Sequence, residues 1–355
     1  MADNGFPARI RTEAAQAAFF RAGAAFFAAW RLAACYNTPM DPPLKLGISA
    51  CLLGEKVRYD GGHKLDSFLA ETLGRFVTFV PVCPETECGL GVPREAMRLM
   101  GDPARPRLVT IHSGIDHTGR LQQWAARRVE ELAREELCGF IFKSRSPSSG
   151  MERVKVYAGE GAPVKKGVGL FARAFMDRFP LLPVEDEGRL HDPVLRENFI
   201  TRIFVLRRWR DLLASHKNRG GLVAFHTRHK LLLLGHSEQH YRAMGKLVAA
   251  AKTMPQQTLF AQYETLLLEA LRLKSTVAKQ SNVLLHALGY FKTVLSRDEK
   301  QEMVEIIDHY RQGLVPLIVP ITLLNHYVRK YQESYLAGQV YLNPHPVELK
   351  LRNHV

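Results

Sequence analysis

Cysteines, a glutamate and a run of serines follow three apolar segments of the chain, each where the segment ends. Cys51 closes the first segment, Cys83 and Cys88 follow the second with Glu85 between them, and the serine-rich stretch 144–149 follows the third. Three thiolates suit an iron–sulfur cluster with one iron left open, or a zinc site with an open position, and the spacing alone does not choose between them. The alternative for each cysteine is a buried thiol that only fills space.

The apolar segments predict the elements that must position these residues. They read as buried parallel strands over 45–53, 76–82 and 137–142, and a last strand-like piece covers 181–184 before a linker at 185–188. The helical patterns lie at 65–73, 120–137 and 171–179, and strands that alternate with helices indicate an open α/β sheet. Ligands of such sheets bind outside the carboxyl ends of the strands, so the three cysteines are expected to meet at one edge.

The second half of the chain has a different pattern. Long helical periodicity with few glycines predicts helices over 198–213, 222–250, 258–288, 297–312 and 319–336. The fold class that we predict is an α/β domain with an open, mainly parallel sheet over 45–188, followed by an all-α domain over 189–355. Residues 1–44 are interpreted as an N-terminal extension, either an amphipathic segment or a stretch ahead of a start codon at Met40, with a transit peptide as the alternative. No membrane insertion is predicted, because Arg21 and Arg31 interrupt the apolar run 14–35, and the apolar run 314–324 is too short and contains two prolines.

The charge of the chain indicates its partners. The formal net charge is +14, and the stretch 191–355 holds 23 Lys and Arg against 13 Asp and Glu, so +10 of the surplus lies there. Such a surplus favours polyanions, with nucleic acid first and an anionic membrane surface second. Five cysteines, none after Cys138, argue against a disulfide scaffold and for a reducing, cytoplasmic compartment.

Two groups of basic residues are the candidate RNA contacts. Arg207, Arg208 and Arg210 crowd one expected helix, and Arg228 and Lys230 lie at the start of another. Basic side chains of this kind neutralise the phosphate backbone of nucleic acids. The alternative is that they are ordinary solvated charges.

Three motifs, in order along the chain, closely resemble the TudS family of thiouracil desulfidases. They are LGISACLLGEKVRYDGG at 46–62, VPVCPETECGLGVPR at 80–94 and FKSRSPSSGMERVKVY at 142–157. The rest, from about His191, resembles the YbgA-like helical domain, notably in LVAFHTRHKLLLLGHSEQHYRAMGKLV and KSTVAKQSNVLLHALGYF. The fused arrangement looks like the bacterial RudS-type enzymes, which remove sulfur from 4-thiouridine in transfer RNA.

The resemblance implies a 4Fe–4S cluster on three cysteines, with a fourth iron that binds the substrate sulfur. Cys51 and Cys83 match the first two ligand positions. The third position of the family lies in a loop that usually reads SPSCG, and here Ser149 occupies it. We predict that Cys88 supplies the third ligand instead. A degraded or hydroxyl-ligated cluster is the alternative for the ligand set, and zinc is the alternative metal.

The resemblance also implies roles for the residues around the cluster. Glu85 matches the acid/base position of the family. The alternative is that its carboxylate only caps the turn that follows it. Ser146 matches the serine beside the substrate, with a hydroxyl bonded to its own backbone as the alternative. The residues expected at the substrate are Arg58, Asp60, Lys143 and Ser148.

The predicted function is iron–sulfur-dependent, non-redox desulfuration of 4-thiouridine in transfer RNA, in which hydrolysis turns C=S into C=O. One alternative is a desulfidase of free thiouracil or other thiolated nucleobases, with a helical domain that is only structural. The other is a non-catalytic, metal-binding RNA adaptor. The sequence leaves the choice between 2-thio and 4-thio bases open, and it predicts no oligomeric state.

Overall fold

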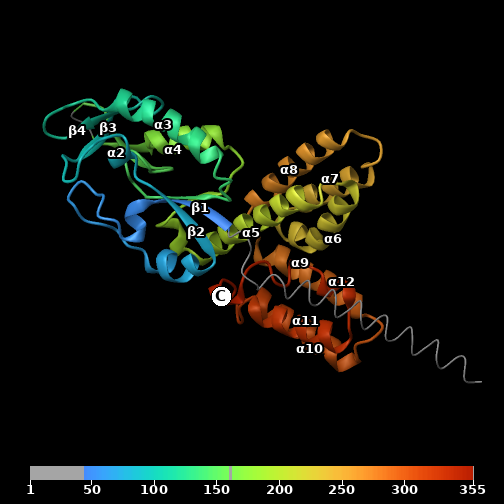
Figure 1. The fold of residues 1–355 in the computed structure, drawn as a ribbon. Helices are drawn as coiled ribbons and strands as arrows, with labels where there is room; N and C mark the ends of the chain where they lie inside the picture. The colour runs from blue at the N-terminus through green and yellow to red at the C-terminus, as the bar shows by residue number, and fades with distance from the viewer. Residues whose placement is uncertain (1–43, 160–161, 355) are drawn as a thin grey trace, which may run out of the picture. The chain divides into compact units, whose positions relative to one another are not determined.

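The computed structural model describes residues 44–159 and 162–354, so nearly all of the N-terminal extension lies outside the described residues. Contacts between residues divide the chain into two compact units (Figure 1). The sheet unit runs to Lys217 and also includes Gln257–Lys274, and the helical unit contains Asn218–Gln256 and the chain from Ser275 onward. The predicted division at 188/189 stays a prediction, and by contacts the helices at 193–215 and 257–272 belong to the sheet unit.

A four-stranded parallel sheet forms the centre of the sheet unit. Its order is β2-β1-β5-β8, and the strands are β1 (Leu44–Ser49), β2 (Val77–Val82), β5 (Phe140–Phe142) and β8 (Val184–Asp186). This confirms the predicted open, mainly parallel sheet. Pro81 lies in β2, which is an edge strand, where a residue without an N–H is tolerated.

Aromatic side chains join this sheet to two helices, α3 (Thr118–Ala133) and α4 (Leu170–Arg178). The ring centroids of Phe140 in β5 and Phe175 in α4 lie 4.8 Å apart, and those of Trp124 in α3 and Phe171 in α4 lie 5.4 Å apart. These rings are buried in one hydrophobic core. Burial of this much aromatic surface holds the sheet and its strand ends in a fixed position.

A second sheet was not predicted from the sequence. Its order is β4-β3-β6-β7, and its strands are β3 (Met97–Met100), β4 (Arg107–Thr110), β6 (Val154–Tyr157) and β7 (Val164–Gly167). Each strand has only four residues, and three of the four in β7 are exposed. Such short, charged segments give no hydrophobic pattern that periodicity can detect.

The linker predicted at 185–188 is wrong, because Glu185 and Asp186 belong to strand β8 and are buried. Three acidic residues followed by a glycine are typical of an exposed linker, which is why the sequence predicted one here. Glu185 is instead paired with Arg189 at 2.5 Å, so its charge is compensated inside the unit. Glu187, the next residue, pairs with Lys143.

Short helical turns complete the sheet unit. The helix expected at 65–73 is a π-helical turn followed by a 3-10 turn, and α2 (Pro84–Glu87) is one turn long. The 3-10 and π-helical turns of the sheet unit are Ala50–Leu53, Phe68–Thr72, Leu73–Arg75 and Arg189–His191, and those of the helical unit are Gly289–Phe291 and Val347–Leu349. Helix α5 (Pro193–Ser215) begins at Asp192, whose side chain accepts hydrogen bonds from two backbone N–H groups.

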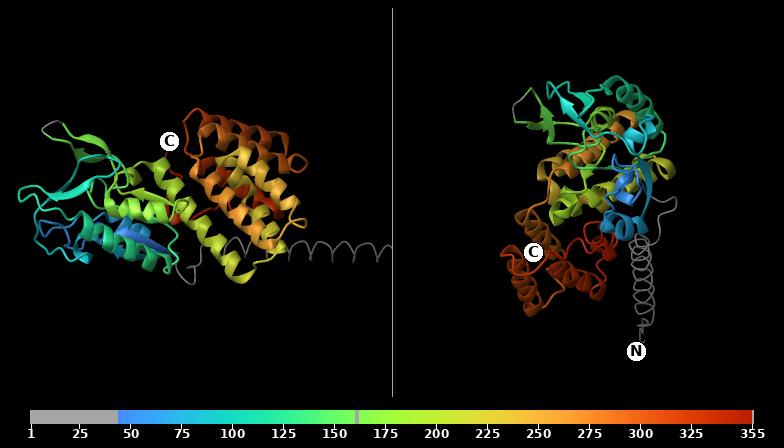
Figure 2. Two further views of the ribbon diagram at one scale, coloured as in Figure 1. Left: turned by 90° about the horizontal axis from the view of Figure 1, so that it is seen from above. Right: turned by 90° about the vertical axis from the view of Figure 1, so that its left-hand side faces the viewer.

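The described part of the chain from α5 onward is all helical, as predicted. In the helical unit, helices that are neighbours or near neighbours along the chain pack against one another in pairs (Figure 2). The two long predicted helices are each divided in two, since Ser237 and Thr276 act as N-caps of new helices. The helices are α6 (Arg219–His236), α7 (Glu238–Ala249), α8 (Gln256–Arg272), α9 (Val277–Leu288), α10 (Arg297–Arg311), α11 (Ile318–Lys330) and α12 (Ser334–Ala337). Among the described residues, none of the helices is both long and apolar enough to cross a bilayer.

Candidate functional site

The register of the parallel sheet brings the strand ends to one edge. Ser49 of β1 lies opposite Val82 of β2, and Phe142 of β5 lies opposite Asp186 of β8. The chain passes from β1 to β2 on one side and later to β5 on the other, which makes β1 the switch point of the sheet. Open α/β sheets bind ligands in the crevice at such a point.

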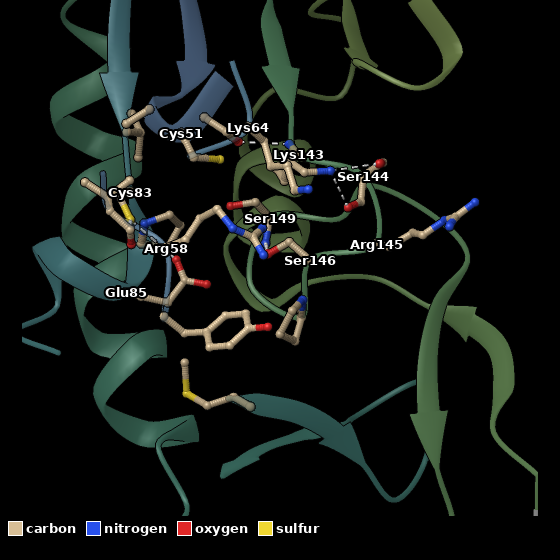
Figure 3. Close-up of a pocket in the computed structure, with 18 of the residues that line it drawn as sticks. Cys51, Arg58, Lys64, Cys83, Glu85, Lys143, Ser144, Arg145, Ser146 and Ser149 are labelled. Atoms are coloured by element: carbon tan, nitrogen blue, oxygen red, sulfur yellow. Dashed lines mark hydrogen bonds between the residues drawn. The ribbon is translucent and has the colours of Figure 1, made fainter. Parts of the chain in front are cut away.

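A cavity of about 330 Å³ lies at this edge (Figure 3). Segments that follow β1, β2 and β5 all contribute to its wall. The lining residues that bear polar or sulfur groups are Ser49, Cys51, Arg58, Tyr59, Lys64, Cys83, Glu85, Arg94, Met97, Lys143, Ser144, Arg145, Ser146 and Ser149. The cavity therefore lies at the edge of the sheet where the sequence predicted that the cysteines meet.

Two buried thiols face this cavity. Cys51 lies in the turn after β1, and Cys83 is the N-cap residue of α2. Burial raises the pKa of Cys51 to about 11, against the effect of nearby Lys143, and Cys83 and Glu85 raise it further. Burial, and then Glu85, also raise the pKa of the Cys83 thiol. Both thiols are free, and soft sulfur ligands of this kind suit an iron–sulfur or zinc centre.

Glu85 extends from α2 into the same cavity. One carboxylate oxygen, Oε1, accepts a hydrogen bond of 2.6 Å from the Ser148 hydroxyl. The other, Oε2, lies 3.6 Å from the Cys83 sulfur and 3.9 Å from Nη2 of Arg94. The carboxylate is therefore held at the thiols, with a basic side chain behind it, where it can take or give a proton.

The serine loop is held together by its own hydrogen bonds. Ser146 Oγ accepts from the backbone N–H of Ser149 at 3.1 Å and lies 3.0 Å from Ser148 Oγ. Gly150 follows, and a Cβ there would lie 2.4 Å from Val154 Cγ2 and 2.6 Å from the Ser146 carbonyl oxygen, so only glycine fits. Ser146 and Ser149 line the cavity, whereas Ser148 is fully buried behind them and acts on Glu85.

The expected substrate residues are divided between the cavity and the outside. Arg58 and Lys143 line it, and Lys143 also pairs with Glu187. The pKa of Glu187 is lowered, because hydrogen bonds from Lys143 and Ser144 outweigh the effect of burial. Asp60 is exposed, does not line the cavity and accepts a hydrogen bond from the backbone N–H of Gly62, so it stabilises a turn outside the cavity.

Cys88 does not line the cavity. It ends α2, its thiol lies 3.3 Å from the Glu85 carbonyl oxygen, and it packs against the hydrophobic core on α3. Among the described residues, no group of three or more Cys, His, Asp and Glu side chains is arranged around one point. Cys138 is buried beside Arg210, and Cys35 lies outside the described residues.

Sequence reasoning gave no role to several residues of the wall. Arg94 donates to the carbonyl oxygens of Val57 and Gly91, at 3.0 and 3.2 Å, and so pins two loops beside Glu85. Tyr59 and Lys64 also line the cavity. Arg94 and Tyr59 both fall inside the quoted motifs, so a search of those motifs for basic and aromatic residues could have found them.

The predicted RNA contacts on α5 are engaged within the sheet unit. Arg207 pairs with Asp211 at 2.9 Å, and Arg210 donates to the Glu136 carbonyl. Arg208 is buried, which lowers its pKa to about 10. Arg228 and Lys230 lie on α6, in the other unit. The three arginines of α5 are therefore buried or half-buried in the sheet unit.

The helical unit contains a cavity of its own, of about 250 Å³. Its charged side chains are Arg329, Lys350 and Arg352, and no acidic side chain of the described residues lines it. His345 and Asn343 add further hydrogen-bonding groups. Three basic side chains in one cavity favour an anionic ligand.

Comparison with known proteins assigns each half of the chain. Residues 46–187 match the family model of 2-thiouracil desulfurase, and residues 230–346 match DUF1722, a protein family of unknown function. The chain is 32% identical to the uncharacterized protein YbgA of Escherichia coli K12 over 158 residues, which is 44% of this chain and 94% of YbgA. It is also similar to the solved structure of TudS, a [4Fe-4S]-dependent thiouracil desulfidase, at 30% identity over 42% of this chain and 94% of that one, with a TM-score of 0.36. As the motifs implied, the chain belongs to the YbgA family through its helical half and carries a 2-thiouracil desulfurase domain ahead of it.

Proposed function

We propose that this protein is an iron–sulfur-dependent desulfidase that removes sulfur from a thiolated pyrimidine, with 4-thiouridine in transfer RNA as its substrate. The family match supports thiouracil desulfidase activity. The observation that carries the proposal is the shared cavity of Cys51, Cys83 and Glu85 at the switch point of the sheet. The free, buried thiols also support a reducing, cytoplasmic location.

The residues of the cavity fit an iron–sulfur cluster in charge as well as in donor type. Two thiols supply soft ligands, and a cluster with thiolate ligands carries negative charge. Among the described lining residues five are basic, and Glu85 alone is acidic. When bound, the cluster would supply a thiophilic Lewis acid next to the carboxylate.

The chain's own residues then provide the proton chemistry. Glu85 takes a proton from the attacking water as the water oxygen bonds to the ring carbon. The carbon–sulfur bond then breaks as the proton held by Glu85 goes to the departing sulfur, which leaves as HS⁻. The freed Glu85 carboxylate takes the remaining hydroxyl proton of the former water, so C=S has become C=O with no change of oxidation state. General acid–base help of this kind contributes about 10²–10⁴-fold. Ser148 holds the carboxylate in place through its hydrogen bond of 2.6 Å to Oε1.

Support for transfer RNA as the substrate comes from the charge of the second half. Of the +10 that this half carries, +7 lies in the stretches 218–256 and 275–355 of the helical unit, which hold 15 Lys and Arg against 8 Asp and Glu, and the cavity of that unit is lined by three basic residues. Lys and Arg side chains that neutralise phosphates provide the sequence-independent part of nucleic-acid affinity. The helical unit is thus assigned to RNA binding, and the sheet unit to the chemistry.

The test is mass spectrometry of nucleosides from thiolated transfer RNA that has been incubated with anaerobically reconstituted protein. We expect conversion of 4-thiouridine to uridine with release of sulfide, and we expect the cluster-loaded Glu85→Gln variant to lose this conversion. Turnover of free thiouracil without change of the transfer RNA would overturn the RNA substrate and retain the desulfidase. A loaded protein that acts on neither would overturn the enzyme and favour the RNA adaptor.

A further inference from the structure

The cavity at the strand ends offers two sulfur ligands from the described chain, and a cluster with one open iron needs three protein donors. Cys51 and Cys83 line the cavity, and Cys88 does not. The reason lies in α2, which is one turn long. Its turn places Cys83 and Glu85 toward the cavity, and Cys88, five residues after Cys83, faces the Glu85 carbonyl and the core on α3.

Ser149 is the further donor at the cavity. It lines the wall with Cys51 and Cys83, and only 3% of its surface is exposed to solvent (Figure 3). Its hydroxyl has one long contact, 3.5 Å to Ser148 Oγ, whereas its backbone N–H is fixed by Ser146 at 3.1 Å. The loop thus holds the backbone firmly and leaves the hydroxyl, in the cavity wall that it shares with the two thiols, with no hydrogen bond shorter than 3.5 Å.

We propose that Ser149, and not Cys88, is the third protein donor to the cluster. This inference rests on the cluster of the proposed function. The Ser149 hydroxyl loses its proton to solvent when it binds iron as an alkoxide, and no electron is transferred. Oxygen is a harder ligand than sulfur, so this corner of the cluster is bound less firmly than the thiolate corners. The cluster of this protein is therefore expected to lose iron to a chelator more easily than one held by three thiolates.

The experiment compares four variants of the full chain, reconstituted anaerobically with iron and sulfide: Cys51→Ala, Cys88→Ala, Ser149→Ala and Ser149→Cys. The measurements are bound iron, acid-labile sulfide, the visible absorbance of the cluster, and the rate at which a chelator removes iron. Far-ultraviolet circular dichroism of each variant reports folding. Ser149→Cys guards against a folding defect at this buried position, because it keeps the size of the side chain close to that of serine.

We expect Cys88→Ala to load a full cluster like the unaltered protein, and Ser149→Ala to lose the visible absorbance as Cys51→Ala does. Ser149→Cys is expected to load fully and to release iron more slowly than the unaltered protein. Loss of the cluster in Cys88→Ala, or full loading of a folded Ser149→Ala, would overturn the inference and leave the proposed function standing. An unaltered protein that binds no cluster, or a Cys51→Ala variant that binds one normally, would instead reject the cofactor of the proposed function.

Discussion

Removal of the Ser148 hydroxyl tests whether the carboxylate of Glu85 must be held in place. Ser148 is fully buried and does not line the cavity, so it has no direct route to a substrate. Its Oγ donates to Glu85 Oε1 at 2.6 Å and lies 3.0 Å from Ser146 Oγ. Ser148→Ala therefore frees Glu85 without removing it.

The size of the effect follows from this one hydrogen bond. A hydrogen bond to a charged group contributes about 1.5–3 kcal/mol, and if all of it is expressed in the transition state, kcat falls about 10- to 150-fold. The decrease in kcat should be smaller than that of Glu85→Gln, for which a decrease of about 10²–10⁴-fold is expected. KM should not change, because Ser148 is outside the cavity wall.

The assay is steady-state desulfuration of a thiolated pyrimidine by protein with a measured cluster content. The matched control is Ser113→Ala, which also removes a serine-to-glutamate hydrogen bond, here of 2.7 Å to Glu95, at residues that do not line the cavity. A cluster-loaded Ser148→Ala enzyme with unchanged kcat would refute the reasoning. A raised KM with unchanged kcat would return Ser148 to the substrate-binding role that the sequence suggested.

Three further predictions concern the rest of the molecule. Arg329→Ala and Lys350→Ala should each weaken transfer-RNA binding and leave the turnover of free thiouracil unchanged. The slope of log K against log salt concentration should become less steep by about the equivalent of one phosphate contact, which filter binding over a salt series measures. Trp209→Ala should cost the sheet unit about 3–5 kcal/mol of unfolding free energy in urea, because Trp209 is fully buried. Glu299→Gln should lower the melting temperature at neutral pH, since hydrogen bonds from Lys330 and others lower the Glu299 pKa to about 2. A carboxyl group whose pKa is lowered in the folded protein stabilises the fold at pH values above its ordinary pKa of 4.5, and this stabilisation is lost as the pH falls toward 2. The difference in melting temperature between the unaltered protein and Glu299→Gln should therefore shrink over this pH range.

The position of helix α5 changes how the two halves can be separated. By contacts α5 and α8 belong to the sheet unit, where Trp209 of α5 stacks on Tyr263 of α8 with ring centroids 5.2 Å apart. A truncation at the start of α5 would remove this buried pair, which is part of the sheet unit, together with the helical unit. Point substitutions in the helical unit are therefore a cleaner test of RNA binding than a deletion of the second half.

The sequence by itself determined the parallel sheet and the edge at which its strands end. Apolar runs of this length form buried strands, and parallel strands end at a common edge, so Cys51, Cys83 and Lys143 had to come close together. The motifs around them then implied the family. The second sheet escaped detection, because strands of four residues with exposed lysines have no distinctive pattern.

Tertiary structure alone decided which of the neighbouring polar residues face the cavity. Cys83 and Cys88 are five residues apart, and the single turn of α2 sends one thiol to the cavity and the other to the core. Ser148 and Ser149 are adjacent, yet one acts on Glu85 from behind and the other lines the wall. Side-chain direction in a short turn depends on local dihedral angles and on the packing around it, and neither is written in the spacing of the residues.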